Sequence, residues 1–164
     1  MVTARPRAAK GELPVEETSH AKGTLVTGVI GNDVHISGIR ILEYALRKEG
    51  FNVVALGALT PQEEFIHAAI ETQADAILVS SLNGHAKIAC QGLREKCVEA
   101  GLGNILLYLG GMLVVGEARF EMTWPQVECM FQQMGFDRVY RPLVLPGRVI
   151  ADLNMDIAKK KGAL

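Results

Sequence analysis

The residues best suited to chemistry in this chain are Asp33, His35 and Gly38, which are spaced Asp-x-His-x-x-Gly. A histidine with a nearby carboxylate is the arrangement expected of an imidazole that binds a metal through one ring nitrogen while the acid orients the ring through the other. Gly38 would let a bulky ligand approach the backbone, because glycine has no side chain. The motif therefore predicts a metal-ligating histidine and its orienting acid.

Two further segments are expected at the same site. Ser80, Ser81 and Leu82 form one of them, and Gly110 with Gly111 forms the other. Each of the three segments follows an apolar run that predicts a strand. The loops after the carboxyl ends of parallel strands line one rim of an open sheet, and ligands bind there. The serine hydroxyls at this rim could donate to a ligand or cap the end of the strand, and the glycines could make room for a ligand or form a plain turn.

The absence of further metal-binding residues near His35 limits the kinds of metal site that the sequence can form. No second histidine, cysteine or carboxylate lies at ordinary metal-ligand spacing from His35. A zinc or non-haem iron site would need two or three more protein ligands. One protein ligand is enough when a macrocycle supplies the others, so the sequence favours haem or a corrinoid.

These segments depend on elements that alternate along the chain. Apolar runs predict strands at 25–30, 53–56, 76–80, 105–109 and 138–140, and amphipathic periodicity predicts helices at 38–49, 61–72, 88–100, 125–135 and 149–160. The helix at 61–72 is expected to begin with Thr60 as N-cap and Pro61 as its first residue. Alternation with continuously apolar strands predicts a parallel sheet covered on both faces. We therefore expect a flavodoxin-like α/β fold of strand order 2-1-3-4-5. It should form one domain over residues 24–164, preceded by a disordered leader at 1–23.

Composition excludes several classes of function. The chain has 164 residues, a net charge of −1 and only 5% aromatic residues, so no basic field or stacking platform is available for nucleic acid. No apolar run reaches the length of a membrane span, and no secretory signal is recognisable. Cys90, Cys97 and Cys129 cannot all pair, and small buried thiols in a reducing cytoplasm are the favoured interpretation.

The three motifs, with their long gaps, resemble the cobalamin-binding signature of the "base-off, His-on" proteins. Further blocks resemble the small S (sigma) subunits of glutamate mutase, also called methylaspartate mutase, and together the likeness covers about residues 25–153. The blocks are 28–31, 50–54, 61–63, 68–72, 74–82 and 135–140.

This resemblance implies the cofactor and its contacts. Adenosylcobalamin would be bound with His35 as the axial ligand to cobalt and Asp33 as the residue that orients it. Ser80 would hydrogen-bond near the buried base, and Leu82 would form a wall of the pocket. The full set implied to contact the cofactor is Asn32, Asp33, Val34, His35, Ile36, Gly38, Ser80, Ser81, Leu82, Gly110, Gly111, Met112, Leu113, Val114, Val115 and Gly116.

The resemblance also implies a reaction and a partner. The chain would be one subunit of an isomerase that interconverts L-glutamate and L-threo-3-methylaspartate by a radical carbon-skeleton rearrangement. It has no length left for a (β/α)8 barrel, so a separate large E (epsilon) subunit would hold the substrate, in a two-plus-two heterotetramer.

Other interpretations stay open at this stage. The chain could be the small subunit of an acyl-CoA mutase, a corrinoid-dependent methyl carrier or a cobalamin sensor, all of which would use the same site. A flavodoxin-like domain that binds nothing is the remaining alternative, and it would leave the three rim motifs as a coincidence.

Overall fold

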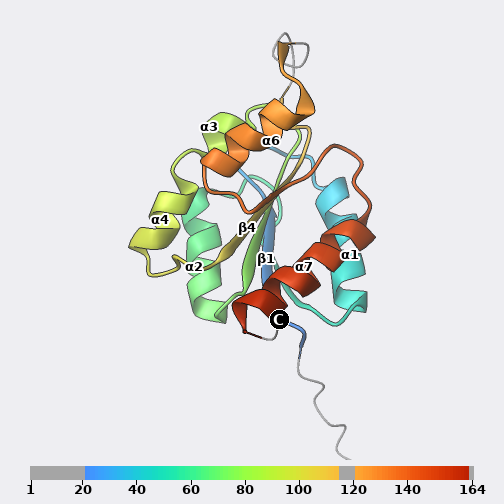
Figure 1. Cartoon of the computed structure of the whole chain (residues 1–164), viewed down its shortest axis with the longest axis vertical. Helices are drawn as coiled ribbons and strands as arrows, with labels where there is room; N and C mark the ends of the chain where they lie inside the picture. Colours follow the sequence, from blue (N-terminus) through green and yellow to red (C-terminus); the bar gives the residue numbers. More distant parts are fainter. Residues whose placement is uncertain (1–20, 115–120, 163–164) are drawn as a thin grey trace, which may run out of the picture.

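The computed structural model describes residues 21–114 and 121–162. Its centre is a five-stranded, fully parallel sheet of order β2-β1-β3-β4-β5, which confirms the fold predicted from the sequence. The strands are β1 (Thr24–Val29), β2 (Asn52–Ala55), β3 (Ala76–Ser81), β4 (Leu106–Gly111) and β5 (Arg138–Val139). Because all strands run the same way, their carboxyl ends form one rim, at the top of Figure 1.

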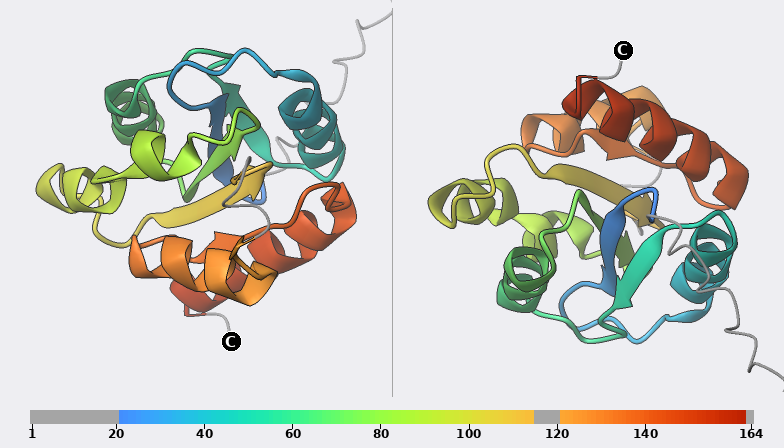
Figure 2. Two further views of the ribbon diagram at one scale, coloured as in Figure 1. Left: turned by 90° about the horizontal axis from the view of Figure 1, so that it is seen from above. Right: turned by 90° about the horizontal axis from the view of Figure 1, so that it is seen from below.

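Helices cover both faces of the sheet (Figure 2). The helices α1 (Ser37–Lys48) and α7 (Pro146–Lys160) pack on one face. The other face carries α2 (Gln62–Thr72), α3 (Ala86–Cys90), α4 (Leu93–Glu99) and α6 (Trp124–Gln133). The molecule is therefore a three-layer sandwich whose loops meet along the rim.

Each central strand contributes side chains to the hydrophobic cores on both faces of the sheet. Every residue of β3 is buried, and successive side chains point to opposite faces. Ile77 and Val79 belong to the core beneath α2, α4 and α6, whereas Ala76 and Leu78 belong to the core beneath α1 and α7. A strand buried on both faces must be apolar throughout, which is why this run showed no alternation in the sequence.

Two helix predictions were wrong in detail. The expected helix at 88–100 is broken into α3 and α4 at Gly92, whose φ of +80° suits a residue without a Cβ. The Gln62 amide donates hydrogen bonds to the carbonyls of Ala89 and Gln91, which lose helical partners at the break. The last helix also begins earlier than expected, at Pro146, because proline suits the first turn of a helix.

The expected start of α2 was also wrong. Thr60 does not cap the helix, because its hydroxyl donates to the carbonyl of Gly57 and its backbone forms a parallel bridge with Ile30. Pro61 takes the N-cap position and the helix starts at Gln62. Thr60 is therefore used to hold the β2–α2 loop against β1.

A network of buried and half-buried polar groups fastens α7 to the sheet. The Tyr108 hydroxyl donates to Asp156 at 2.6 Å, and the Tyr140 hydroxyl donates to Asp152 at 2.9 Å. Arg138 donates twice to Asp156, at 2.9 and 2.8 Å. Burial, together with the hydrogen bond to Asp152, raises the pKa of Tyr140 well above its ordinary value. Both tyrosines therefore remain donors at neutral pH and hold the helix in place.

Replacing Tyr108 by phenylalanine tests this network. Tyr108→Phe removes one hydrogen bond to a carboxylate, and should lower the free energy of unfolding by about 1–2 kcal/mol in urea titrations. Tyr44→Phe is the matched control, because Tyr44 is 64% exposed on α1, and it should change the free energy by less than about 0.5 kcal/mol. Equal losses in the two variants would contradict a role for the network.

Candidate functional site

The loop between β1 and α1 holds Asp33 and His35 in direct contact. The Asp33 carboxylate is fully buried, and its Oδ1 lies 2.7 Å from Nδ1 of His35 and 3.0 Å from the His35 backbone nitrogen. The His35 side chain is 58% exposed. An ionised carboxylate can only accept, so Nδ1 carries the ring proton and donates it. In the neutral ring, Nε2 then carries a lone pair on the exposed side chain, as a metal ligand requires.

The second oxygen of Asp33 reaches a different loop. Oδ2 accepts hydrogen bonds from the backbone N–H groups of Leu82 and Asn83, at 2.5 and 3.1 Å. The Asp33 carbonyl also accepts from the N–H of Leu59, at 3.0 Å, in the β2–α2 loop. One residue therefore joins the loops that follow β1, β2 and β3.

The protonation state of Asp33 follows from these contacts. Burial by itself raises the pKa of the carboxyl group, but donors from Leu82, His35 and Asn83 more than offset it, so the pKa ends below the ordinary value of 3.8. Hydrogen bonds to the charged form favour that form. Asp33 is consequently an anion at neutral pH, and its charge is shared among four donors.

The serines and glycines lie opposite one another across β3 and β4. Ser80 pairs with Gly110 and Ser81 with Gly111 in the parallel register, and both serines are buried. Gly111 has φ +119°, and a Cβ there would overlap the backbone oxygen of Ser81. A Cβ on Gly110 would meet only the Cβ of Tyr140, at 3.7 Å. The two motifs are thus adjacent at the rim, as the topology predicted.

The other predicted site residues vary in exposure. Asn32, Val34 and Gly38 are exposed, and nothing lies within 4 Å of where a Cβ on Gly38 would stand. Ile36, Leu82, Met112 and Val114 are half-buried, whereas Leu113 is buried in the core. Val115 and Gly116 lie outside the described residues.

Two rim residues were missed by sequence reasoning. Asn83 Oδ1 accepts from the backbone N–H of His85 at 3.0 Å, which shapes the turn after β3. Leu59 donates its N–H to Asp33 from the next loop. The Asn83-Gly84 pair is a recognisable turn signal. No sequence feature near Leu59 indicated its hydrogen bond to Asp33.

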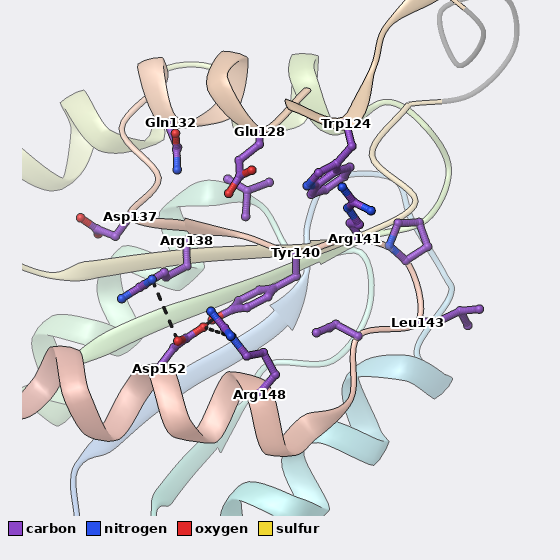
Figure 3. Close-up of a pocket in the computed structure, with 13 residues that line it drawn as sticks. Trp124, Glu128, Gln132, Asp137, Arg138, Tyr140, Arg141, Leu143, Arg148 and Asp152 are labelled. Atoms are coloured by element: carbon purple, nitrogen blue, oxygen red, sulfur yellow. Dashed lines mark hydrogen bonds and ion pairs between the residues drawn. The ribbon is translucent and has the colours of Figure 1, made fainter. Parts of the chain in front are cut away.

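A groove of about 530 Å³ lies beyond the edge strand, between α6, the β5–α7 loop and α7 (Figure 3). Its lining includes Arg138, Tyr140 and Asp152 of the polar network, and none of the predicted site residues lines it. The Arg141 guanidinium lies over the Trp124 ring, 5.5 Å from its centroid. Arg138 and Arg148 both pair with Asp152. Because none of the predicted site residues lines it, the groove is separate from the histidine site.

The described residues contain neither a grouped set of metal ligands nor a membrane-spanning helix. Within residues 21–114 and 121–162, no three His, Cys, Asp or Glu side chains are grouped so as to hold a metal ion. In the same ranges, no helix has the length and apolarity that crossing a membrane requires.

Comparison with known proteins identifies the family. The B12 binding domain profile matches residues 23–135. The glutamate mutase sigma subunit of Clostridium tetani is 57% identical over 136 residues, which cover 83% of this chain and 96% of the relative. The sigma subunit of Clostridium cochlearium gives the same identity and coverage.

The chain belongs to the glutamate mutase sigma subunits. This membership confirms the resemblance inferred from the rim motifs. It also favours the sigma subunits over the acyl-CoA mutase, methyl-carrier and sensor alternatives.

A more distant likeness concerns the fold alone. A cobalamin-binding protein from Desulfitobacterium hafniense superposes with a TM-score of 0.65 at 17% sequence identity. The match covers 82% of this sigma-family chain and 58% of the other chain. The two proteins share the parallel sheet and its covering helices.

The pH dependence of stability tests the state of Asp33. Since its folded pKa lies below the ordinary 3.8, the ionised carboxylate stabilises the fold above that pH, and this contribution is lost as pH falls through the folded pKa. Asp33→Asn should therefore lower the free energy of unfolding by about 1–3 kcal/mol at pH 7. The difference from the unchanged protein should shrink below about pH 4.

Glu64→Gln is the control for this measurement, because Glu64 is exposed on α2. Urea titrations at several pH values should show almost no difference for this variant. A loss for Asp33→Asn that is independent of pH would show that the charge of Asp33 contributes nothing.

The two glycines at the end of β4 should respond differently to alanine. Gly111→Ala should lower the melting temperature by about ten degrees or abolish folding, because its Cβ collides with the Ser81 backbone and its φ is positive. Gly110→Ala, with only an ordinary contact, should melt within a few degrees of the unchanged protein. Thermal unfolding followed by circular dichroism measures both, and equal melting temperatures would refute the close approach of β3 and β4.

Proposed function

We infer that the chain works as the cobalamin-binding subunit of a glutamate mutase, an isomerase, and we propose that His35 is its ligand to the cobalt of adenosylcobalamin. The observation that carries the assignment is the contact between Asp33 and Nδ1 of His35. It leaves Nε2 as the free nitrogen of an exposed imidazole at the rim. Nothing else in the described chain combines a free imidazole nitrogen with a buried, ionised orienting acid.

The residues around His35 fit a large, flat cofactor. Gly38 stands in open space at the start of α1, so a corrin ring could lie against the backbone there. Ser80 and Ser81 present hydroxyls at the carboxyl end of β3, opposite Gly110 and Gly111. We propose that these residues receive the nucleotide tail, together with the segment from Met112 to Gly116.

The chain's own residues have distinct tasks in this proposal. Asp33 fixes the ring of His35 and keeps its proton on Nδ1, which makes Nε2 a better electron donor. Because the Asp33 carboxylate also accepts hydrogen bonds from the N–H groups of Leu82 and Asn83, it holds the loop after β3 beside the histidine. Adenosylcobalamin supplies the radical chemistry, and the protein supplies binding and orientation.

A sigma subunit implies a partner subunit of glutamate mutase. We propose that the partner is the large epsilon subunit, that it holds glutamate, and that the two assemble as a two-plus-two heterotetramer. In this proposal the rim of this chain holds the cofactor and the partner holds the substrate. The free thiols of Cys90, Cys97 and Cys129 fit a reducing compartment, and we expect the assembly in the cytoplasm.

A cobalamin titration followed by visible spectroscopy tests the ligand. The unchanged chain should give the spectrum of cobalamin without its own base and with a histidine on cobalt, and His35→Ala should not. His67→Ala is the matched control, because His67 is exposed on α2 and lies outside the rim loops. Asp33→Asn should keep the spectrum but bind about 10–100-fold more weakly.

Activity is then measured after adding the large subunit of the Clostridium cochlearium enzyme. Formation of methylaspartate with the unchanged chain and with His67→Ala, but not with His35→Ala, is the expected result. An unchanged spectrum in His35→Ala would overturn the assignment of the ligand. Cobalamin binding without formation of methylaspartate would support the cobalamin site but contradict the proposed glutamate mutase activity.

A further inference from the structure

The short helix α3 begins in the loop that supplies backbone donors to Asp33. Its N-cap is His85, whose N–H donates to Asn83 Oδ1 at 3.0 Å. The N–H of Asn83 in turn donates to Asp33 Oδ2 at 3.1 Å. The start of α3 is therefore joined through one residue to the acid that orients His35.

The end of α3 is held by a side chain from another helix. Gln62 is the first residue of α2, and its amide donates to the carbonyls of Ala89 and Gln91, at 2.7 and 2.9 Å. These carbonyls lie at the break before α4, where helical partners are missing. Oε1 of Gln62 is buried and accepts no hydrogen bond within the described residues. The contact therefore uses only the donors of the amide.

Packing alone gives α3 little support. Ala86 and Cys90 are fully buried but small, and Ile88, its largest apolar side chain, is 75% exposed. Stabilisation by burial follows the apolar area removed from water, so small side chains contribute little. A helix of five residues is also too short to be stable by itself. The position of α3 should therefore depend on the hydrogen bonds at its two ends.

The same corner also touches the loop that carries Asp33. A Cβ on Gly31 would stand 3.2 Å from the Cβ of Ala89, so α3 lies against the backbone two residues before Asp33. The N–H of Gly31 donates to the carbonyl of Thr60 at 2.9 Å, just before the start of α2. In Figure 1, α3 lies above α2, at the rim. The start of α2, the end of α3 and the Asp33 loop thus meet at one point.

We propose that Gln62 is a positioning residue for the cofactor site, because by holding the end of α3 it keeps the N–H groups of Leu82 and Asn83 on Asp33. The proposal rests on the proposed function. Gln62 makes no hydrogen bond to Asp33 or His35, and acts through α3. Releasing the end of α3 lets this short helix fray, and the loop before it then loosens its contacts with Asp33.

Substitutions at Gln62 separate the donors from the rest of the side chain. Gln62→Lys keeps N–H donors and lacks only the acceptor that the contact does not use. Gln62→Glu keeps the shape and lacks the donors, while a negative charge in the first turn favours α2 itself. Gln62→Met also lacks the donors, and replaces Gln62→Glu if that variant fails to fold. Gln133→Glu, at an exposed position at the end of α6, is the matched control.

Amide hydrogen exchange of the chain without cofactor gives the first readout. In Gln62→Glu, exchange should be about tenfold faster at the N–H groups of Leu82 and Asn83, and unchanged inside β1 and β3. A cobalamin titration gives the second readout, in which Gln62→Glu should raise the dissociation constant about tenfold. Gln62→Lys and Gln133→Glu should match the unchanged chain in both measurements.

Each other outcome has a definite meaning. Unchanged exchange at Leu82 and Asn83 in the variants without donors would refute the proposal. Equal losses in Gln62→Lys and Gln62→Glu would also overturn it, because the donors would then be irrelevant. Faster exchange throughout the sheet would overturn it by assigning Gln62 a general stabilising role. If the unchanged chain binds no cobalamin, the proposed function has failed, while hydrogen exchange still decides whether Gln62 holds the loop at Asp33.

Discussion

The carboxylate of Asp33 is the contact on which the rim depends. It has no exposed surface, and four donors surround it: two from His35 and the backbone N–H groups of Leu82 and Asn83. A buried charge is tolerated when it is hydrogen-bonded in this way. The group that orients the histidine is therefore also the group that joins two loops, so the imidazole cannot be repositioned without disturbing the end of β3.

The site rests on the end of a sheet whose geometry is fixed by a close backbone approach and by side-chain hydrogen bonds. Gly111 lies too close to the Ser81 carbonyl for any side chain to fit. On the outer side, Asp152 and Asp156 of α7 accept from Tyr140, Tyr108 and Arg138. The loops that carry the candidate cofactor residues thus project from a rigid base, which favours a site that keeps its shape.

The sequence predicted the fold, and the meeting of the candidate site residues at one rim, because their signals are local. Apolar runs gave the strands, and the order of a parallel sheet placed His35, Ser80 and Gly110 at one rim. The backbone donors to Asp33 could not be predicted, because they come from a loop about 50 residues away and every residue type has an N–H group. The break at Gly92 was missed because apolar periodicity continues through it into α4.

The edge strand β5 has a further consequence for assembly. It has two residues, Arg138 and Val139, and Pro142 follows shortly after. Long, flat, unpaired strand edges invite other chains to add to them, whereas short edges with arginine and proline close by do not. Because β5 offers so few free backbone groups, the addition of strands from other chains is disfavoured at this edge of the sheet.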